Sequence, residues 1–342
     1  MGKAAICNPY LDTLGGGERY SLSLAGVLVK AGWEVDVEWK DSSLKEKLQD
    51  RFGLNLKSLN FVADTKNGSG YDLCFWVSDG SIPLLHSRKN ILHFQVPFHD
   101  VEGGSLWNRM KLFRINKIVC NSKFTKAVID KEYKVDSLVV YPPVDVAKIK
   151  AKRKEDLILY VGRFSELVQS KRQDVLIAAF KKFSRQVPGW KLILAGGSDV
   201  GGKEYLAKLK KQAKRLNVEI LENISYKQLV GLYGKAKFFW SAAGFGVNEK
   251  SHPERLEHFG VTTVEAMAAG ALPLVFNAGG AREIVKPEQN GLLWESVDEL
   301  VKKTGGLLED KGFWRKLSAA ARESSASFNS ETFSQKVLAL LS

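Results

Sequence analysis

Short apolar runs alternate with amphipathic segments along almost the whole chain. The runs are short enough for buried strands, and the segments between them repeat apolar residues at helical spacing. This alternation predicts parallel sheets with crossover helices. In the first half, strands are expected at 4–8, 34–39, 72–77, 91–96, 117–121 and 138–141, and helices at 18–30 and 123–133.

A pair of prolines, Pro142 and Pro143, interrupts this alternation. Proline cannot continue a strand or sit inside a helix, so the pair predicts a domain boundary. The alternation restarts near residue 156, and the economical interpretation is two doubly wound α/β domains joined near residue 145. In the second half, strands are expected at 156–162, 191–195, 218–221, 238–241 and 272–276, and helices at 173–185, 204–216 and 226–234.

Composition supports two folded domains and favours anionic partners. The chain has 342 residues, 44% of them apolar, and a formal net charge of +13. Such an excess favours phosphorylated ligands, anionic lipid or nucleic acid. It divides into 21 − 17 = +4 before residue 151 and 30 − 21 = +9 after it. No uninterrupted basic tract accompanies it, so no specific nucleic-acid partner is expected.

The cysteines and the chain's N-terminal sequence predict a cytoplasmic protein. Cys7, Cys74 and Cys120 lie far apart in apolar runs, which fits buried thiols better than a zinc site or disulfides. No apolar run is long enough to span a membrane. The first residues lead directly into a predicted strand without the plan of a signal peptide.

Two glycine-rich turns are candidate phosphate loops. Gly16 and Gly17 follow the first strand and precede a helix, where backbone N–H groups favour an anion. A tight strand-to-helix turn explains them equally well. The segment 197–204 has the spacing of a nucleoside-triphosphatase loop, but Glu204 stands where Ser or Thr should hold magnesium, so we interpret it as a chance match.

Two cations follow the strand expected at 156–162. Arg163 presents a fork of donors and Lys171 a point charge, and both suit phosphate oxygens. Solvated loop cations are the alternative, since exposed arginine and lysine are common.

The segment from Glu257 to Gly270 carries the most informative pattern. Glu257 and Glu265 are separated by seven residues, and Gly260 is expected to open a helix between them. Carboxylates near a helix N-terminus accept hydrogen bonds from vicinal hydroxyls, while the loop N–H groups suit a phosphate. A further glycine pair, Gly279 and Gly280, follows the next strand.

This segment resembles the signature of family-4 retaining glycosyltransferases, Glu-x7-Glu followed by Ala-Met-Ala-x-Gly-x-Pro and completed by Pro273. The resemblance covers essentially the whole chain. It implies the GT-B fold, two Rossmann-like domains facing a central cleft. It implies an acceptor-side domain at 1–146, a nucleotide-sugar domain at 147–327 and a C-terminal helix at about 328–342 that packs back on the first domain. Other motifs in family order are Ser122-x-Phe124-Thr125, Tyr141-Pro142-Pro143-Val144-Asp145, and Gly279-Gly280 with Glu283.

The resemblance also implies roles for matching residues. Glu265 would bind the donor ribose, and Glu257 would meet hydroxyls of the transferred sugar. Arg163 and Lys171 would hold the diphosphate, and His93, at a strand end, would face the sugar unless it is structural. Backbone groups expected to contact the donor belong to Gly16, Gly17, Phe259, Gly260, Gly279 and Gly280.

The implied reaction is hexosyl transfer from a UDP- or GDP-linked sugar to a glycan, a lipid-linked or a small-molecule acceptor. The sequence has no Asp-x-Asp at a strand end, so we expect no metal, and no cofactor besides the donor substrate. Two other readings stay open: a different GT-B enzyme, such as an epimerase, or a non-catalytic nucleotide-sugar or polyanion-binding protein. The loop 244–256 would cover the site, contact the acceptor or be an ordinary surface loop, and its Glu254 competes with Glu257 for the sugar.

The segment from Arg109 to Lys134 is strongly basic, with a charge of 8 − 2 = +6, and Leu106, Trp107, Met110 and Phe113 lie before or within it. Basic residues mixed with aromatic ones suit an anionic membrane surface. A core-packing helix with solvated lysines is the favoured alternative. Peripheral contact with the inner face of a membrane is therefore an open expectation.

Overall fold

The computed structural model describes residues 2–13, 15–165, 171–198 and 202–341. They form two compact units, Met1–Pro143 with Ser330–Ser342, and Val144–Asn329. The first change of unit thus comes three residues before the boundary expected after residue 146, and the return comes at residue 330 rather than 328. Both units are parallel α/β sheets with crossover helices, so the expected pair of doubly wound Rossmann-like domains is confirmed.

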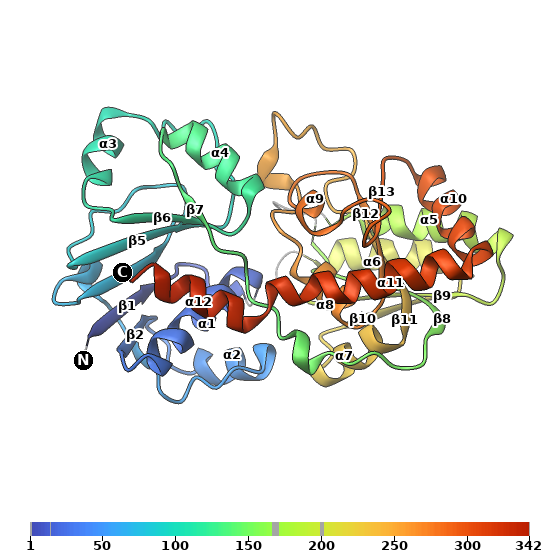
Figure 1. Cartoon of the computed structure of the whole chain (residues 1–342), viewed down its shortest axis with the longest axis horizontal. Helices are drawn as coiled ribbons and strands as arrows, with labels where there is room; N and C mark the ends of the chain where they lie inside the picture. Colours follow the sequence, from blue (N-terminus) through green and yellow to red (C-terminus); the bar gives the residue numbers. More distant parts are fainter. Residues whose placement is uncertain (1, 14, 166–170, 199–201, 342) are drawn as a thin grey trace. The chain divides into compact units, whose positions relative to one another are not determined.

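In the first unit a seven-stranded sheet has the order β3-β2-β1-β4-β5-β6-β7, and each neighbouring pair is parallel (Figure 1). The order reverses between β1 and β4. The strands are β1 Lys3–Cys7, β2 Glu34–Glu38, β3 Asn60–Val62, β4 Leu73–Val77, β5 Lys89–Phe94, β6 Lys117–Cys120 and β7 Leu138–Val139; the helices are α1 Gly16–Lys30, α2 Leu44–Phe52, α3 Leu106–Leu112, α4 Lys123–Tyr133 and α12 Ser330–Ala339.

The second unit repeats this plan with a six-stranded parallel sheet of order β10-β9-β8-β11-β12-β13. The reversal lies between β8 and β11, and parallel sheets of this order bind ligands beyond the carboxyl ends of the strands at that point. The strands are β8 Glu155–Val161, β9 Lys191–Gly196, β10 Val218–Glu222, β11 Ala236–Ser241, β12 Leu272–Phe276 and β13 Leu292–Trp294; the helices are α5 Gln173–Gln186, α6 Lys203–Ala213, α7 Tyr226–Lys235, α8 Val261–Ala268, α9 Ala281–Ile284, α10 Val297–Glu309 and α11 Lys311–Ser325.

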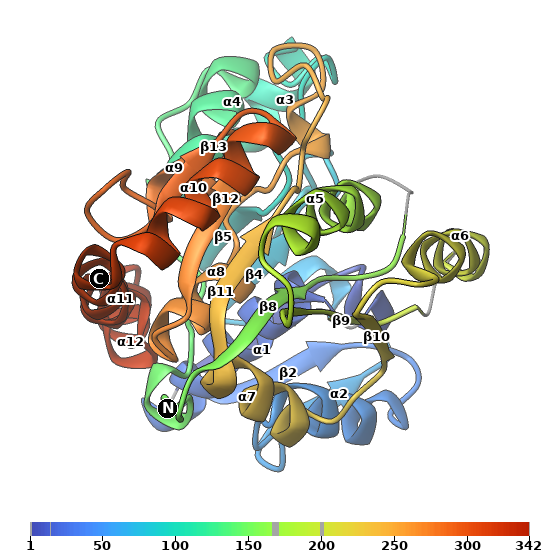
Figure 2. The ribbon, with the colours of Figure 1, turned by 90° about the vertical axis from the view of Figure 1, so that its right-hand side faces the viewer.

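Helices cover both faces of the second sheet (Figure 2). Helices α5 and α6 pack on β9 and β10, whereas α7 packs on β8 and α8 on β11 and β12. The sheet core is aromatic: Trp190 stacks on Phe238, and Phe183 packs edge-on against Trp240. Among the described helices, none is both long and apolar enough to cross a bilayer.

The C-terminal helix α12 completes the core of the first unit. It packs against α1, far away in the sequence, and the two lie side by side in Figure 1. The ring of Phe333 meets Tyr20 edge-on, with centroids 5.2 Å apart. Phe333, Val337 and Leu340 are all buried in the cluster that contains the β1 and β4 side chains.

Because α12 is part of this core, shortening Phe333 should destabilise the first unit although it lies near the end of the chain. Phe333→Ala should cost about 3–5 kcal/mol of unfolding free energy by equilibrium urea denaturation. Leu338→Ala on the same helix is the matched control, since Leu338 is 43% exposed, and it should change stability by less than about 0.5 kcal/mol. Equal effects of the two substitutions would show that α12 is not docked.

Candidate active site

The carboxyl edge of the second sheet gathers the loops that carry the predicted motif. Gly162 and Arg163 follow β8, the loop 242–260 follows β11, and Gly279 and Gly280 follow β12. Because all these strands are parallel, the three loops share one edge of the sheet, on both sides of its order reversal. This is the position where doubly wound sheets hold their ligands.

An ion pair joins two of the predicted residues at this edge. The Nζ of Lys171 donates to Oε2 of Glu257 at 2.8 Å, and the two side chains are only 12% and 18% exposed. Glu257 also lies near the phenol of Tyr160; burial first, and then the charge of Glu257, raise the Tyr160 pKa well above its ordinary value. A half-buried lysine–carboxylate pair loses much of its hydration, so each partner depends on the other for compensation.

The two glycine-containing loops meet so closely that side chains would not fit between them. The N–H of Gly280 donates to the carbonyl of Glu257 at 2.8 Å. A Cβ on Gly279 would overlap the carbonyl oxygen of Glu257, and one on Gly280 would overlap that of His258. Gly279 also has a φ of +55°, in the left-handed region. These glycines therefore fix where Glu257 sits, in addition to any contact they make with a donor.

Gly260 begins α8, as the sequence predicts. It is the N-cap residue and has a φ of +112°, a conformation that glycine adopts without strain. Phe259 buries its ring against Phe328, with centroids 5.3 Å apart, so only its backbone is suited to the donor contact expected of it. The residues that precede α8 thus present backbone groups, and not an aromatic surface, at the helix N-terminus.

Glu265 lies within α8 and is almost fully buried. The hydroxyl of Tyr233 on α7 donates to its Oε2 at 2.8 Å. A buried carboxylate requires such partners, because burial without them carries a large desolvation cost. Glu265 is thus a buried residue of the helix that directly follows the Glu257 loop.

The loop after β8 is tied down by a residue that the sequence analysis does not single out. The buried side chain of Gln173 donates through Nε2 to the carbonyls of Gly162, at 3.3 Å, and Arg163, at 2.9 Å. This leaves the Arg163 side chain exposed. Residues 166–170, between Arg163 and Lys171, lie outside the described residues, as do residues 199–201 of the triphosphatase-like segment.

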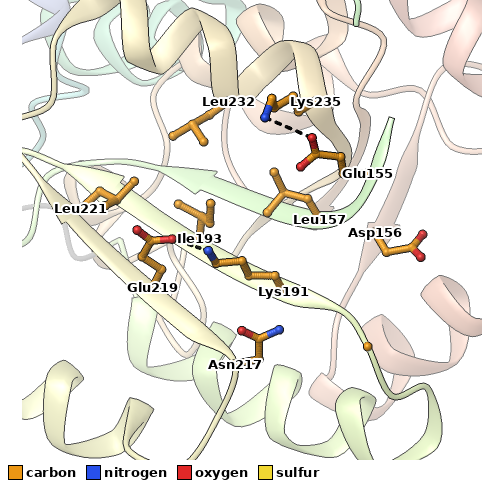
Figure 3. A pocket seen from close by; sticks show the side chains of 11 residues that line it. Glu155, Asp156, Leu157, Lys191, Ile193, Asn217, Glu219, Leu221, Leu232 and Lys235 are labelled. Carbon is orange, nitrogen blue, oxygen red and sulfur yellow. Dashed lines mark ion pairs between the residues drawn. The ribbon is translucent and has the colours of Figure 1, made fainter. Parts of the chain in front are cut away.

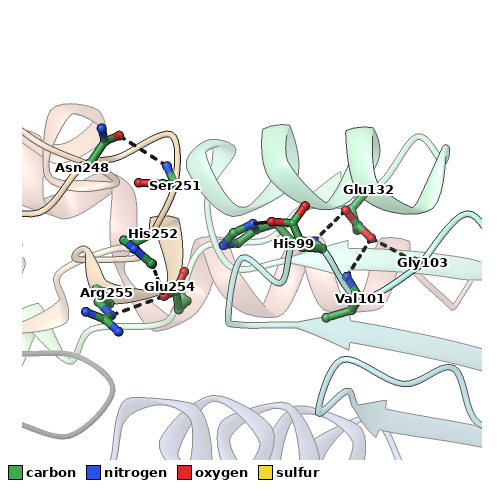
Figure 4. Close-up of polar contacts among 10 residues, drawn as sticks. His99, Val101, Gly103, Glu132, Asn248, Ser251, His252, Glu254 and Arg255 are labelled. Atoms are coloured by element: carbon green, nitrogen blue, oxygen red, sulfur yellow. Dashed lines mark hydrogen bonds and ion pairs between the residues drawn. The ribbon is translucent and has the colours of Figure 1, made fainter.

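The loop 244–256 is anchored within the second unit. Arg172 donates to the carbonyl of Phe245 at 2.6 Å, and Arg282 contacts both carboxylate oxygens of Glu249 at 3.0 and 2.9 Å. Glu254, the competitor of Glu257, pairs with His252 and Arg255 (Figure 4). Glu254 thus makes ion pairs within its own loop, and the choice between Glu254 and Glu257 for the sugar stays a prediction.

In the first unit His93 is a fully buried residue of β5. Its ring stacks on Tyr20, with centroids 4.2 Å apart, and its Nδ1 lies 3.1 Å from the carbonyl of Val119. Burial lowers the His93 pKa to about 3, so the imidazole is neutral at physiological pH. Since a carbonyl only accepts, Nδ1 carries the proton, and Nε2 is a buried acceptor without a partner among the described residues.

Two neighbouring polar residues were also missed by the sequence analysis. Gln95 follows β5 and Asn121 follows β6, and the Asn121 amide donates to the Gln95 carbonyl at 3.0 Å. The side-chain oxygens of both are buried and without partners among the described residues. With Nε2 of His93, they make three unsatisfied acceptors at the carboxyl ends of the adjacent strands β5 and β6. A hydroxylated ligand can satisfy such acceptors.

The turn at Gly16 and Gly17 favours the tight-turn interpretation. The carboxylate of Glu18 accepts from the N–H of Gly15 at 2.6 Å, so the start of α1 already has a negative charge beside it. A Cβ on Gly17 would overlap the side chain of Gln95, whereas Gly16 has nothing within 4 Å of such a Cβ. Donor contact by these two glycines stays a prediction.

The hollow in Figure 3 is not the candidate site. It lies against β8, β9, β10 and α7 and includes the residues at the start of β8 and β9, away from the carboxyl edge. Its charged residues are paired: Lys235 with Glu155 at 3.1 Å, Lys191 with Glu219 at 2.5 Å, and Asp156 with Lys237, outside the hollow, at 3.6 Å. Nothing in it matches the chemistry of the motif.

Comparison with known proteins agrees with this geometry. The chain is 27% identical over 222 residues to the GDP-Man:Man(3)GlcNAc(2)-PP-Dol alpha-1,2-mannosyltransferase of Dictyostelium discoideum, covering 61% of this chain and 42% of that protein. It is 30% identical over 168 residues to a GDP-mannose-dependent phosphatidylinositol monomannoside mannosyltransferase of Mycobacterium tuberculosis, covering 46% and 40%. The chain thus spans less than half the length of either relative.

Solved structures share the fold over the whole chain. Anabaena HepE in complex with UDP has a TM-score of 0.76 at 18% identity, covering 100% of this chain and 99% of that one. A glycosyltransferase from Rickettsia africae has a TM-score of 0.77 at 17% identity, with 99% and 97% covered.

The model of the family "Glycosyl transferases group 1" matches residues 143–324, which include every predicted residue of the second unit. The chain therefore belongs to the group 1 glycosyl transferases and has their GT-B fold.

Proposed function

We propose that this protein is a retaining hexosyltransferase that moves mannose from GDP-mannose to a glycan or lipid-linked acceptor without a metal ion. The observation that carries the proposal is the Lys171–Glu257 pair beside Gly260, at the order reversal of the second sheet. The pair sets a cation and a carboxylate next to the N-terminus of α8, where the carboxylate would bind the sugar. The relatives that act with GDP-mannose support the choice of donor.

Donor recognition would use the two carboxylates of the motif. Glu265 would accept hydrogen bonds from the ribose hydroxyls, in part exchanging the one that it receives from Tyr233. Glu257 would accept from hydroxyls of the transferred mannose, and the N–H groups around Phe259 and Gly260 would bind phosphate oxygens. Because the glycine packing already fixes the loop around Glu257, donor binding does not have to pay the entropy of ordering it.

In the reaction, the bond between the anomeric carbon and the β-phosphate oxygen breaks as the acceptor oxygen bonds to the same face of that carbon. The acceptor proton passes to the departing phosphate oxygen, so GDP leaves and the anomeric configuration is retained. Lys171, Arg163 and the N-terminus of α8 would stabilise the charge that develops on the diphosphate. These cations supply the charge that a metal ion provides in other transferases.

The same pair gives Lys171 two tasks. In this structure its ammonium group compensates Glu257. With donor bound, it would lie between that carboxylate and the β-phosphate, so its charge would serve both sugar and leaving group.

The protein would act at the cytoplasmic face of a membrane as a peripheral protein, because the mannosyltransferase relatives carry lipid-linked or lipid substrates in their names.

Glu265→Gln should weaken GDP binding, because a hydrogen bond to a charged group is worth about 1.5–3 kcal/mol, or roughly ten- to a hundredfold in Kd. Isothermal titration calorimetry with GDP and GDP-mannose would measure it. Glu254→Gln is the matched control, since its carboxylate pairs with His252 and Arg255, and it should bind like the wild type. Unchanged affinity in Glu265→Gln would refute the ribose assignment.

Arg163→Ala and Lys171→Ala should each reduce kcat/KM for mannosyl transfer by more than tenfold. The double variant should lose less than the product of the two effects, because both side chains act on one leaving group. Lys182→Ala, an exposed lysine paired with Asp298, is the control and should retain full turnover. Undiminished turnover in the double variant would show that Arg163 and Lys171 do not stabilise the departing diphosphate.

A further inference from the structure

Helix α3 carries an unusual apolar surface. Leu106 is 74% exposed, Trp107 75%, Met110 55% and Phe113, just after the helix, 91%. These four are half of the eight large hydrophobic side chains that are exposed among the described residues. We call Leu106, Trp107, Met110 and Phe113 the α3 surface. The core-packing interpretation favoured from sequence is wrong for them, since α3 has no buried residue.

The segment that carries the α3 surface packs on the first unit through other side chains. Leu112 and Ile115 pack, partly buried, against the cluster that contains Phe94 and Tyr133. Because Leu112 and Ile115 already make the contacts between this segment and the core, the α3 surface residues do not pack into the same core. Leu106, Met110 and Phe113 follow one another at spacings of four and three, so they lie on one side of the helical turn.

The loop that leads into α3 is rigidly held. Glu132 on α4 accepts three backbone N–H groups, from Asp100, Val101 and Gly103, at 3.1, 3.1 and 2.9 Å, and Figure 4 shows this arrangement. A Cβ on Gly103 would overlap the ring of Tyr133. The exposure of the α3 surface is therefore built into the fold, and it does not depend on a loosely attached segment.

The segment that carries the α3 surface is basic, although Lys126 on α4 pairs with Asp130 and Asp136. From residue 103 to residue 129 the sequence contains no aspartate or glutamate, but it contains six basic residues. Arg109 and Lys111 lie on α3 and Arg114 directly after it. Asp100 and Glu102 stand on the preceding loop, at the amino-terminal end only. The six basic residues are Arg109, Lys111, Arg114, Lys117, Lys123 and Lys126.

We propose that the α3 surface docks this protein on an anionic lipid bilayer. Leucine, methionine, phenylalanine and tryptophan together suit insertion at the boundary of headgroups and acyl chains, and tryptophan prefers that depth. The flanking arginines and lysine contact lipid phosphates. A protein partner would satisfy the apolar residues as well, but the three basic residues on and directly after α3, Arg109, Lys111 and Arg114, favour a polyanionic surface. This inference deepens the proposed function. That a lipid-linked acceptor is presented at the α3 surface rests on the proposed function.

Binding is tested by co-sedimentation with vesicles of phosphatidylcholine, with and without phosphatidylglycerol, at low and physiological salt. Wild-type protein should bind the anionic vesicles and bind them more weakly as salt rises. Leu106→Ser with Phe113→Ser should reduce binding more than tenfold. Arg109→Glu with Lys111→Glu should reduce it at least 25-fold, from about fivefold for each basic residue removed.

Matched controls come from the same unit. Leu138→Ser with Leu338→Ser changes two other exposed leucines, and Lys30→Glu with Lys47→Glu reverses two other exposed lysines; neither pair should reduce vesicle binding by more than about twofold. Urea denaturation should give wild-type midpoints for the α3 variants, because none of the substituted side chains is buried. Brominated acyl chains should quench fluorescence in the wild type but not in Trp107→Phe.

Failure of the docking surface and failure of the proposed function are distinguishable. Vesicle binding is measured without donor, and Glu265→Gln should bind vesicles like the wild type. Equal binding of wild type and α3 variants, or equal and negligible binding to both vesicle types, would overturn the docking surface, whatever the transferase activity. Concentration-dependent dimerisation that the α3 variants abolish, without vesicle binding, would assign the surface to a second copy of the chain and overturn the lipid proposal.

Discussion

The candidate site depends on one steric constraint, the close passage of two backbones at the carboxyl edge of the second sheet. Residues 257 and 258 lie so near residues 279 and 280 that a Cβ on either glycine would overlap a carbonyl oxygen. This contact fixes the path of the loop before α8. It thereby sets the Glu257 carboxylate opposite Lys171, and it leaves Gly260 to open the helix in its left-handed conformation.

Charge compensation then links this edge to the reaction. Lys171 and Glu257 are both largely removed from solvent, so either one alone would be a costly buried charge. A ligand that brings a diphosphate and a hydroxylated sugar offers each of them a further partner. The first unit, taken by itself, has three buried acceptors without partners among the described residues: Nε2 of His93 and the side-chain oxygens of Gln95 and Asn121.

Much of the fold could be predicted from the sequence because buried parallel strands are continuous apolar runs. The strand at 272–276 and the helix at 123–133 were predicted with their observed bounds. Helix α2, with the sequence LKEKLQDRF, was missed because most of its residues are charged or polar. Only two leucines, Leu44 and Leu48, are buried, which is too few for a clear helical repeat of apolar residues. The order of the strands in each sheet could not be predicted, because the sequence pattern does not tell which strands are neighbours. That order determines where the site lies.

For the site, the spacing of Glu257 and Glu265 predicted their helix and loop, and the family resemblance supplied their roles. The pairing of Lys171 with Glu257 could not be predicted, because it joins residues 86 positions apart. Gln173 and Tyr233 were missed for a related reason: each looks like an ordinary helix residue until its hydrogen bond is known. The exposure of the α3 surface was predicted wrongly, since an apolar stripe in a sequence does not tell what covers it.

The most direct test of the account is the anomeric configuration of the product formed from GDP-mannose in excess EDTA. NMR of the product made by wild-type protein, with Glu257→Gln as a comparison, would give both the linkage and the dependence on the site. The account predicts an α-linked mannoside, formed at an undiminished rate with EDTA and lost in Glu257→Gln. A β-linked product, or transfer that stops in EDTA and returns with magnesium or manganese, would contradict it.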